Sequence, residues 1–156
     1  MNATSPSSQS ELDLPAPLRA LLALESGTFL FASLLHLGSP ISLGVAEVSE
    51  PRIIPATVVE GAIAFALGIA AFGAIRRRHW ARTAGIAASG FSIAGVLLGI
   101  TALALGAGPA TPLNRVYHGV MLVVLAGTLA VLLWPTSSRG AQKVAGGDAT
   151  GGNAHG

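Results

Sequence analysis

The sequence predicts an all-α integral membrane protein: a four-helix bundle whose helices run alternately up and down. Of the 156 residues, 51% are hydrophobic and only 10% are charged, whereas soluble domains carry about 25% charged residues. The mean hydropathy is +0.65. Four apolar segments are each long enough to cross a bilayer core of about 30 Å, which takes roughly 20 helical residues. So few charges cannot coat a soluble globule of this size, which argues against a soluble enzyme.

The four segments lie within an expected bundle of residues 15–135. They are residues 17–37, 53–75, 84–105 and 112–134. Gly38 and Pro40 end the first segment, because proline cannot continue the helical hydrogen bonds and glycine tolerates the terminal conformation. Thr111 followed by Pro112 is a natural N-cap and first-turn pair for the fourth segment. Local sequence therefore accounts for these helix ends.

The two ends of the chain are predicted to be disordered tails. Residues 1–14 are polar without a hydrophobic period, and residues 136–156 are rich in Gly, Ala and Ser. Such segments bury too little apolar surface to offset the entropy lost on folding. Because no Lys or Arg precedes Arg19, the start of the chain is a poor signal peptide, and we expect the first helix to be retained.

Basic residues predict the orientation in the membrane. The turn at residues 76–82 contains four Arg and is the densest cationic segment of the chain. The positive-inside rule places this turn in the cytoplasm. Four spans then put both termini in the cytoplasm, with seven Lys and Arg inside and two outside. Trp80 and Trp134 would both lie at the inner interface, where indole rings are favoured. We expect a multi-pass protein of a bacterial plasma membrane.

Small residues on the third segment predict close helix packing. Ala88, Ser92, Gly95 and Gly99 recur on one helix face, and small residues let membrane helices approach closely. Packing within the bundle is the simplest interpretation, and contact with a second copy or a larger membrane complex is the alternative. The lipid bilayer is a further expected partner. We expect no nucleic-acid partner, because the formal net charge is only +2 and phosphate binding needs clustered Lys and Arg.

Three polar side chains are predicted to meet in the outer half of the bundle. His36 lies near the outer end of the first helix. Glu60 and His118 lie roughly 10 Å and roughly 9 Å into the second and fourth helices, from the rise of about 1.5 Å per residue. Alternating helix directions bring these three residues to one level, with Asn114 and Tyr117 as neighbouring hydrogen-bond partners. The sequence thus predicts one polar cluster.

This cluster allows several interpretations, because charged groups at membrane depth are costly and invite a functional explanation. Two imidazoles and one carboxylate suit a transition metal, with His36, Glu60 and His118 as ligands. The two histidines also suit axial ligation of a haem iron. A His and carboxylate column can instead relay protons. The further polar residues of such a path are Glu25, Asn114, Arg115 and Tyr117.

A purely structural role is the interpretation we favour, with no bound cofactor. A hydrogen bond between Glu60 and a His or Arg of another helix fixes the bundle register, and Arg115 is one candidate partner. Glu25 lies eleven residues before His36 on the same helix face and deeper in the membrane. We expect Glu25 to be protonated or hydrogen-bonded to a neighbouring helix, because an unpaired carboxylate there would be too costly.

The whole pattern resembles small four-helix bacterial membrane proteins and is similar in outline to DoxX-like proteins. The features are an acidic residue early in the first helix (LLALESGTF), a basic turn after the second (RRRHWAR) and a polar start to the fourth (NRVYHGVML). The resemblance covers the architecture of residues 17–135, and we carry over no thiosulfate- or quinone-linked activity. We expect a non-catalytic membrane protein, either a subunit of a larger complex or a small oligomer. The alternative is a metal-, haem- or proton-handling bundle.

Overall fold

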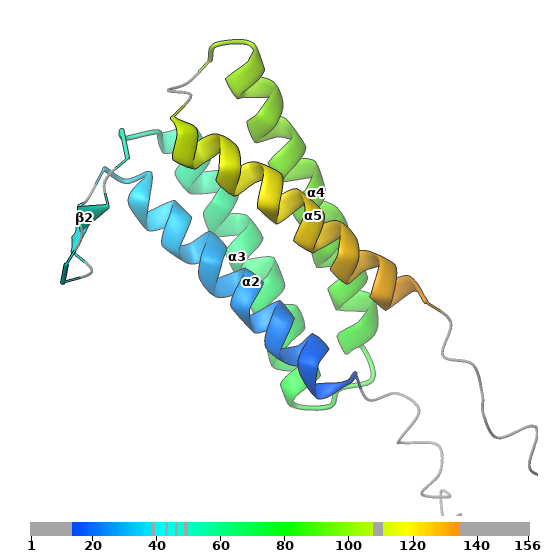
Figure 1. Ribbon diagram of the computed structural model, residues 1–156. Coiled ribbons are helices and arrows are strands. Elements are labelled where there is room, and N and C mark those ends of the chain that lie inside the picture. The colour runs from blue at the N-terminus through cyan, green and yellow to red at the C-terminus, as the bar shows by residue number, and fades with distance from the viewer. Residues whose placement is uncertain are drawn as a thin grey trace, which may run out of the picture.

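The computed structural model describes residues 14–38, 40–42, 44–45, 47–48, 50–107 and 111–134. This part of the chain forms four helices (Figure 1), which are α2 (Ala16–Leu35), α3 (Ile54–Ile75), α4 (Ala81–Ala104) and α5 (Pro112–Leu133). Each helix is long and apolar enough to cross a membrane. The predicted helical architecture with four such helices is therefore confirmed. Apart from Leu14, the predicted tails lie outside the described residues.

Two features differ from the sequence prediction. Helix α4 begins at Ala81, three residues before the predicted start at residue 84. The apolar pattern starts only after Arg82, but the first turn of a helix needs no apolar residue. A short antiparallel hairpin, β1 (Ile41–Ser42) and β2 (Glu47–Val48), occupies the predicted outer loop. Gly44 lies between these strands with a φ of +85°, a conformation that glycine adopts without steric cost.

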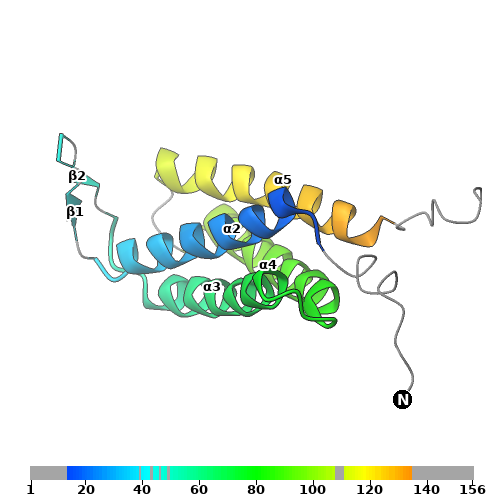
Figure 2. The same cartoon turned by 90° about the horizontal axis from the view of Figure 1, so that it is seen from below.

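Consecutive helices pack side by side: α2 on α3, α3 on α4 and α4 on α5, whereas α2 and α5 touch only sparsely (Figure 2). Two serines hold the α2–α3 contact. The Ser26 hydroxyl donates to the Ala64 carbonyl at 2.8 Å, and the Ser33 hydroxyl donates to the Thr57 carbonyl at 2.9 Å. Helices α2 and α3 therefore form a tight pair, and the looser space lies toward α4 and α5.

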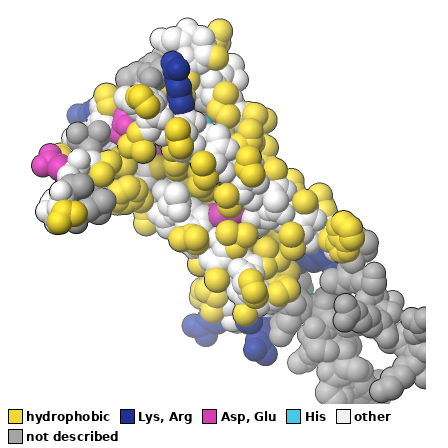
Figure 3. All heavy atoms as spheres, in the orientation of Figure 1, with side chains coloured by type: hydrophobic (Ala, Val, Ile, Leu, Met, Phe, Trp, Pro, Cys, Tyr) yellow, Lys and Arg dark blue, Asp and Glu magenta, His cyan; other side chains and the backbone are white. Residues whose placement is uncertain are grey.

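The outer surface of the helices is apolar. Leu24, Phe65, Leu98 and Val123 are each more than half exposed. Figure 3 shows hydrophobic side chains along the visible face, with Lys and Arg toward the ends. Soluble monomers rarely expose so extensive an apolar surface. The surface thus agrees with four helices that could lie in a membrane.

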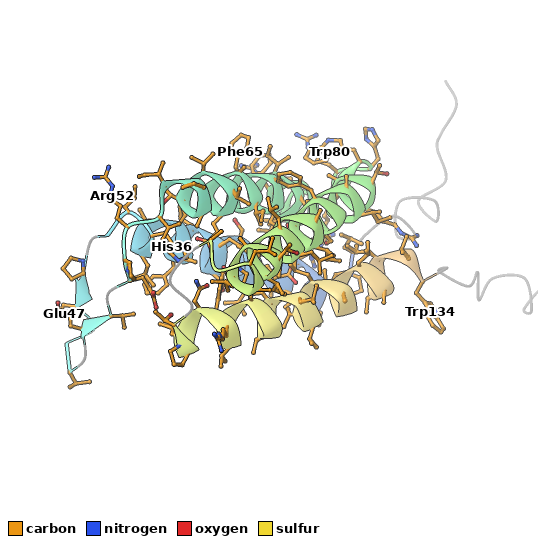
Figure 4. The ribbon with its side chains drawn as sticks, turned by 90° about the horizontal axis from the view of Figure 1, so that it is seen from above. His36, Glu47, Arg52, Phe65, Trp80 and Trp134 are labelled. Atoms are coloured by element: carbon orange, nitrogen blue, oxygen red, sulfur yellow. The ribbon has the colours of Figure 1, made fainter. Side chains whose placement is uncertain are left out.

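The two ends of the bundle have different side chains. The hairpin lies at one end and the α3–α4 turn at the other (Figure 1). Figure 4 shows His36 at the hairpin end and both Trp80 and Trp134 at the opposite end. Arg82 of α4 closes that opposite end, because its guanidinium donates to the Leu132 carbonyl at 2.9 Å and to the Trp134 carbonyl at 2.8 Å. These bonds satisfy carbonyls that the last turn of α5 leaves unpaired.

The small-residue face of α4 packs inside the molecule. Ala88 and Ser92 are buried. A Cβ at Gly95 would lie 2.6 Å from the Ile63 side chain of α3, and a Cβ at Gly99 would overlap the His118 ring of α5. Helices α3 and α5 can therefore approach α4 closely only because these positions lack side chains. Contact with another subunit through the same face stays a prediction.

Candidate functional site

A buried His–Glu pair joins the end of α2 to α3. His36 directly follows the last residue of α2, and its carbonyl accepts a hydrogen bond from the Ile53 N–H at 2.9 Å. This bond ties the start of α3 to the end of α2. The His36 Nδ1 lies 2.7 Å from the Glu60 Oε2, and the two side chains are 4% and 5% exposed. Because a carboxylate accepts, Nδ1 is the donor, and Nε2 has no hydrogen-bond partner.

The hydrogen bond to Glu60 raises the pKa of His36, against an opposing effect of burial. The negative charges of Glu60 and Glu50 add to the increase. Both carboxylates favour the imidazolium, whereas removal from water disfavours any charged form. His36 therefore holds a proton more tightly than a free histidine.

The stability of the detergent-solubilised protein is expected to fall as the pH rises above about 6.5, the ordinary pKa of histidine. The folded state binds the His36 proton more tightly than the unfolded state does. The resulting stabilisation is complete below the unfolded pKa and is lost as the pH rises through the higher folded pKa. Thermal unfolding followed across this pH window checks the prediction. The His36→Gln variant should lack this slope, and a slope that persists in the variant would contradict the assignment.

His118 lies on α5, and its ring packs against α4. Its Nδ1 donates to the Asn114 carbonyl one turn earlier at 2.8 Å. The Nε2 side of the ring lies against Gly99 of α4. The Tyr117 ring lies edge-on to the imidazole, with the centroids 5.3 Å apart. These contacts use both edges of the ring and hold it in one position.

The three predicted metal ligands do not form one set. His36 and Glu60 are in contact, and His118 lies on another wall of the same cavity. Within the described residues, no three His, Asp or Glu side chains are arranged to hold a metal ion. The predicted depth was informative, but depth does not fix the rotation of a helix, and α5 turns the His118 ring toward α4. The geometry therefore gives no support to a metal site formed by these three residues.

We call the space between these residues the bundle cavity. It has a volume of about 160 Å³ and receives side chains from all four helices. Its walls are mainly apolar, including Phe29, Val59, Ile63, Val96 and Leu98. Three buried atoms without a hydrogen-bond partner belong to its lining side chains: His36 Nε2, Glu60 Oε1 and Asn114 Oδ1. A cavity of roughly 150 Å³ is large enough for one benzene ring.

A second space, the hairpin cavity, lies between α2, α5 and the segment that follows β2. Its volume is about 340 Å³, and His36 and Asn114 line both cavities. Its other polar side chains are Thr28, Glu50 and Tyr117. Glu50 Oε2 and the Tyr117 hydroxyl are buried and lack a hydrogen-bond partner. Unpartnered polar atoms therefore gather around both cavities.

Thr111 connects the hairpin segment to α5. Its hydroxyl donates to Glu50 Oε1 at 3.0 Å and accepts from the Asn114 N–H at 3.1 Å. The second bond confirms the predicted N-cap of α5. The first bond fixes the Glu50 carboxylate at the edge of the hairpin cavity.

The remaining predicted residues have different positions. Asn114 and Tyr117 lie in the cavity walls. Arg115 is exposed, and Glu60 pairs with His36. The predicted Arg115–Glu60 pair is therefore wrong, because Arg115 occupies the outer face of the first turn of α5.

Glu25 is separate from both cavities. It is 1% exposed, and the Thr128 hydroxyl of α5 donates to its Oε1 at 2.6 Å. Its Oε2 has no hydrogen-bond partner. This bond is of the kind expected from the sequence, a link to a neighbouring helix. It connects α2 to α5 where the two helices otherwise touch only sparsely.

The Glu25→Gln variant is expected to stay within about 1 kcal/mol of the wild type in free energy of unfolding. The amide oxygen of Gln can accept the same bond from the Thr128 hydroxyl, and an amide carries no charge that needs a partner. Reversible unfolding in mixed detergent measures this difference. The Thr128→Val variant is the control and should lose about 1 kcal/mol, because it removes the donor. A large loss in Glu25→Gln would instead indicate an ionised partner of Glu25 that the Thr128 bond does not account for.

Sequence reasoning missed two residues of this site. Glu50 lies in the outer loop, where no helical period indicates the direction of a side chain. Gly99 was considered only for helix packing, whereas it also provides the space for the His118 ring. Both contacts join segments that are distant in the chain, and the glutamate–threonine bond spans 61 residues.

Comparisons with known proteins do not place the chain in a family. No family model, no curated protein and no solved structure matches it. The two cavities are therefore the basis for the proposed function.

Proposed function

We propose that the protein is a non-catalytic, membrane-spanning binding protein. Its ligand is a small, uncharged, mostly apolar molecule with one hydrogen-bonding group, which enters the bundle cavity. The observation that carries this proposal is the set of three unpartnered polar atoms in an otherwise apolar cavity: His36 Nε2, Glu60 Oε1 and Asn114 Oδ1. A buried polar atom without a partner costs about 1–3 kcal/mol. A ligand hydroxyl or carbonyl would remove part of this cost.

The size and charge of the cavity define the ligand. About 160 Å³ suits a single ring better than a long chain. The charges of His36 and Glu60 compensate each other in the ion pair, so a charged ligand would lack a counterion there. Small-molecule sites commonly combine apolar walls with a few placed polar groups. The bundle cavity has this composition.

The membrane supplies a route for such a ligand. Leu98 lines the bundle cavity and is 61% exposed on the apolar outer surface. Leu98 therefore connects the cavity wall to the apolar outer surface of α4. A lipid-soluble ring can therefore enter from the bilayer without crossing water. This route favours a binding protein over an enzyme for soluble substrates.

In this proposal the helices cross a bacterial plasma membrane alternately up and down, with both termini in the cytoplasm. The bias of Lys and Arg toward one side supports this orientation. Reporter fusions at Gly44 and Gly146 are expected to score outside and inside, respectively. Agreement of both fusions on one side would refute the topology. The apolar outer surface also suits a small subunit of a membrane complex or a small oligomer, which sizing in detergent measures.

Fluorine NMR with two matched probes tests ligand binding. The purified protein in neutral detergent should bind 4-fluorophenol at least ten times more tightly than fluorobenzene, after correction for partition into empty micelles. The two probes differ in the hydroxyl group, so their ratio isolates the polar contribution. Equal affinities would refute a role for the unpartnered polar atoms.

Two variants locate the binding. Ala102 lines the bundle cavity, so Ala102→Leu should fill it and abolish binding of both probes. Ala87 lies on the exposed face of the same helix, and Ala87→Leu should leave binding unchanged. Binding that survives Ala102→Leu would show that the probes bind elsewhere.

A further inference from the structure

We propose that the hairpin cavity binds an organic ammonium cation, with Glu50 as the counterion and Asn114 and Tyr117 as hydrogen-bond partners. This site is distinct from the ring site of the bundle cavity, although His36 and Asn114 line both. Its ligand has a positively charged amine attached to an apolar body. Three properties of the cavity support this choice: its charge, its free acceptors and its apolar walls.

The hairpin cavity contains a carboxylate, that of Glu50, without a cationic partner among the described residues. Glu50 and Glu60 are the carboxylates near His36, and both act electrostatically on its imidazole. The His36–Glu60 pair is neutral when His36 is protonated. Glu50 then remains with one negative charge, and no described Lys, Arg or His forms an ion pair with it. A bound cation would compensate a carboxylate that is otherwise only hydrogen-bonded to Thr111.

The free acceptors match an ammonium group. Glu50 Oε2, Asn114 Oδ1 and the Tyr117 hydroxyl are buried oxygens without a hydrogen-bond partner. Asn114 is 6% exposed, so bulk water does not satisfy its side chain. An alkylammonium group has three N–H donors and no acceptor, as the lysine side chain does. Three oxygen acceptors on side chains lining one cavity therefore suit this group.

The walls of the cavity indicate an organic cation rather than a metal ion. Phe31, Leu35, Val48 and Leu113 supply much of its lining. Magnesium retains several waters and calcium takes six to eight oxygen ligands, whereas these four apolar side chains supply none. The described residues also hold no set of three metal ligands. An apolar group attached to the ammonium would instead contact these side chains.

The cavity lies at the end of the bundle that carries the hairpin. Val48 and Glu50 contribute to it from the segment between β1 and α3. Figure 4 shows Glu47 and Arg52 on this same segment, beyond the helix ends. A water-soluble amine can therefore reach the cavity without crossing the apolar centre of the bundle. Aromatic rings in the wall, those of Phe31 and Tyr117, can add cation–π attraction.

The test compares benzylammonium with benzyl alcohol, which has a similar shape but no charge. Isothermal titration of the full chain in neutral detergent should show benzylammonium binding at least tenfold more tightly. Glu50→Gln should remove this difference. The amide oxygen of Gln can still accept from Thr111, so the fold should be retained, and the melting temperature checks this. Glu47→Gln is the matched control, because Glu47 is an exposed carboxylate of the same hairpin.

Several outcomes would overturn the proposal. These are equal binding of the two probes to the wild type, unchanged benzylammonium binding in Glu50→Gln, and complete displacement of benzylammonium by equimolar Mg²⁺. If Glu50→Gln does not fold, Tyr117→Phe replaces it and should weaken benzylammonium binding about threefold or more, whereas unchanged binding would count against the site. Benzylammonium binding should persist in Ala102→Leu, which separates this proposal from that for the bundle cavity.

Discussion

Replacing His36 with Ala is expected to lower the free energy of unfolding by about 3–5 kcal/mol, the usual cost of removing one partner of a buried ion pair. The loss has two sources. Glu60 would keep a carboxylate that is 5% exposed and has no partner. The end of α2 would also lose its side-chain link to α3. Equilibrium unfolding in mixed detergent measures the change, and a loss below about 1 kcal/mol would contradict a buried pair of this kind.

A double variant separates stability from binding. The His36→Phe, Glu60→Leu protein replaces the pair with apolar side chains, and such replacements are often neutral or stabilising. Its stability should therefore recover most of the loss seen in His36→Ala. The preference for 4-fluorophenol over fluorobenzene should nevertheless disappear, because two of the three unpartnered polar atoms are gone. A double variant that keeps the preference would show that Asn114 alone is responsible for it.

The contact between His36 and Glu60 shows what can be predicted from the depth of a residue along its helix. Counting residues from the helix ends placed both side chains in the outer half of a bundle, and the structure brings them to 2.7 Å. The same count placed His118 at this level, yet its ring packs against Gly99. Rise per residue gives depth along a helix, whereas rotation depends on packing with neighbours. Small residues on α4 determine that rotation, and their contacts cannot be assigned from one helix alone.

The hairpin end was less accessible to sequence reasoning. Helical periodicity identified four apolar segments, because a bilayer requires a long run of apolar residues. A loop with glycine, proline and charged residues has no such period. The role of Glu50 depends on a bond to Thr111 and on the position of α5 beside the hairpin. The partner of Glu25 was similarly hidden, because a threonine such as Thr128 gives no sign of the helix that it faces.

The packing of the helices explains where the two cavities lie. The α2–α3 pair is held closely by serine-to-carbonyl bonds, and α4 approaches α3 through Gly95. Helices α2 and α5 have only sparse contact, so space remains at the hairpin end between them. His36 and Asn114 line both the bundle cavity and the hairpin cavity. Changes at either residue should therefore affect both sites, whereas Glu50 and Ala102 each report on one.

Replacing Gly99 with Ala is expected to destabilise the protein by about 1–3 kcal/mol, the usual cost of overpacking. The new methyl group would overlap the His118 ring. The ring cannot swing away freely, because its Nδ1 is bonded to the Asn114 carbonyl at 2.8 Å and Tyr117 packs against it. Gly90→Ala is the matched control on the same helix, since a Cβ there has no neighbour within 4 Å. This control should gain about 0.5–1 kcal/mol from the lower flexibility of alanine.

A double-mutant cycle with His118→Ala tests whether that overlap is the cause. If the methyl group and the imidazole compete for one space, Gly99→Ala should cost little once the ring is removed. The coupling between the two positions should then fall in the range of about 0.5–3 kcal/mol that contacting residues show. Gly99→Ala should also weaken 4-fluorophenol binding, because His118 lines the bundle cavity and a displaced imidazole would change the shape of that wall. Additive effects of the two substitutions would place the His118 ring away from α4 and would remove that cavity wall.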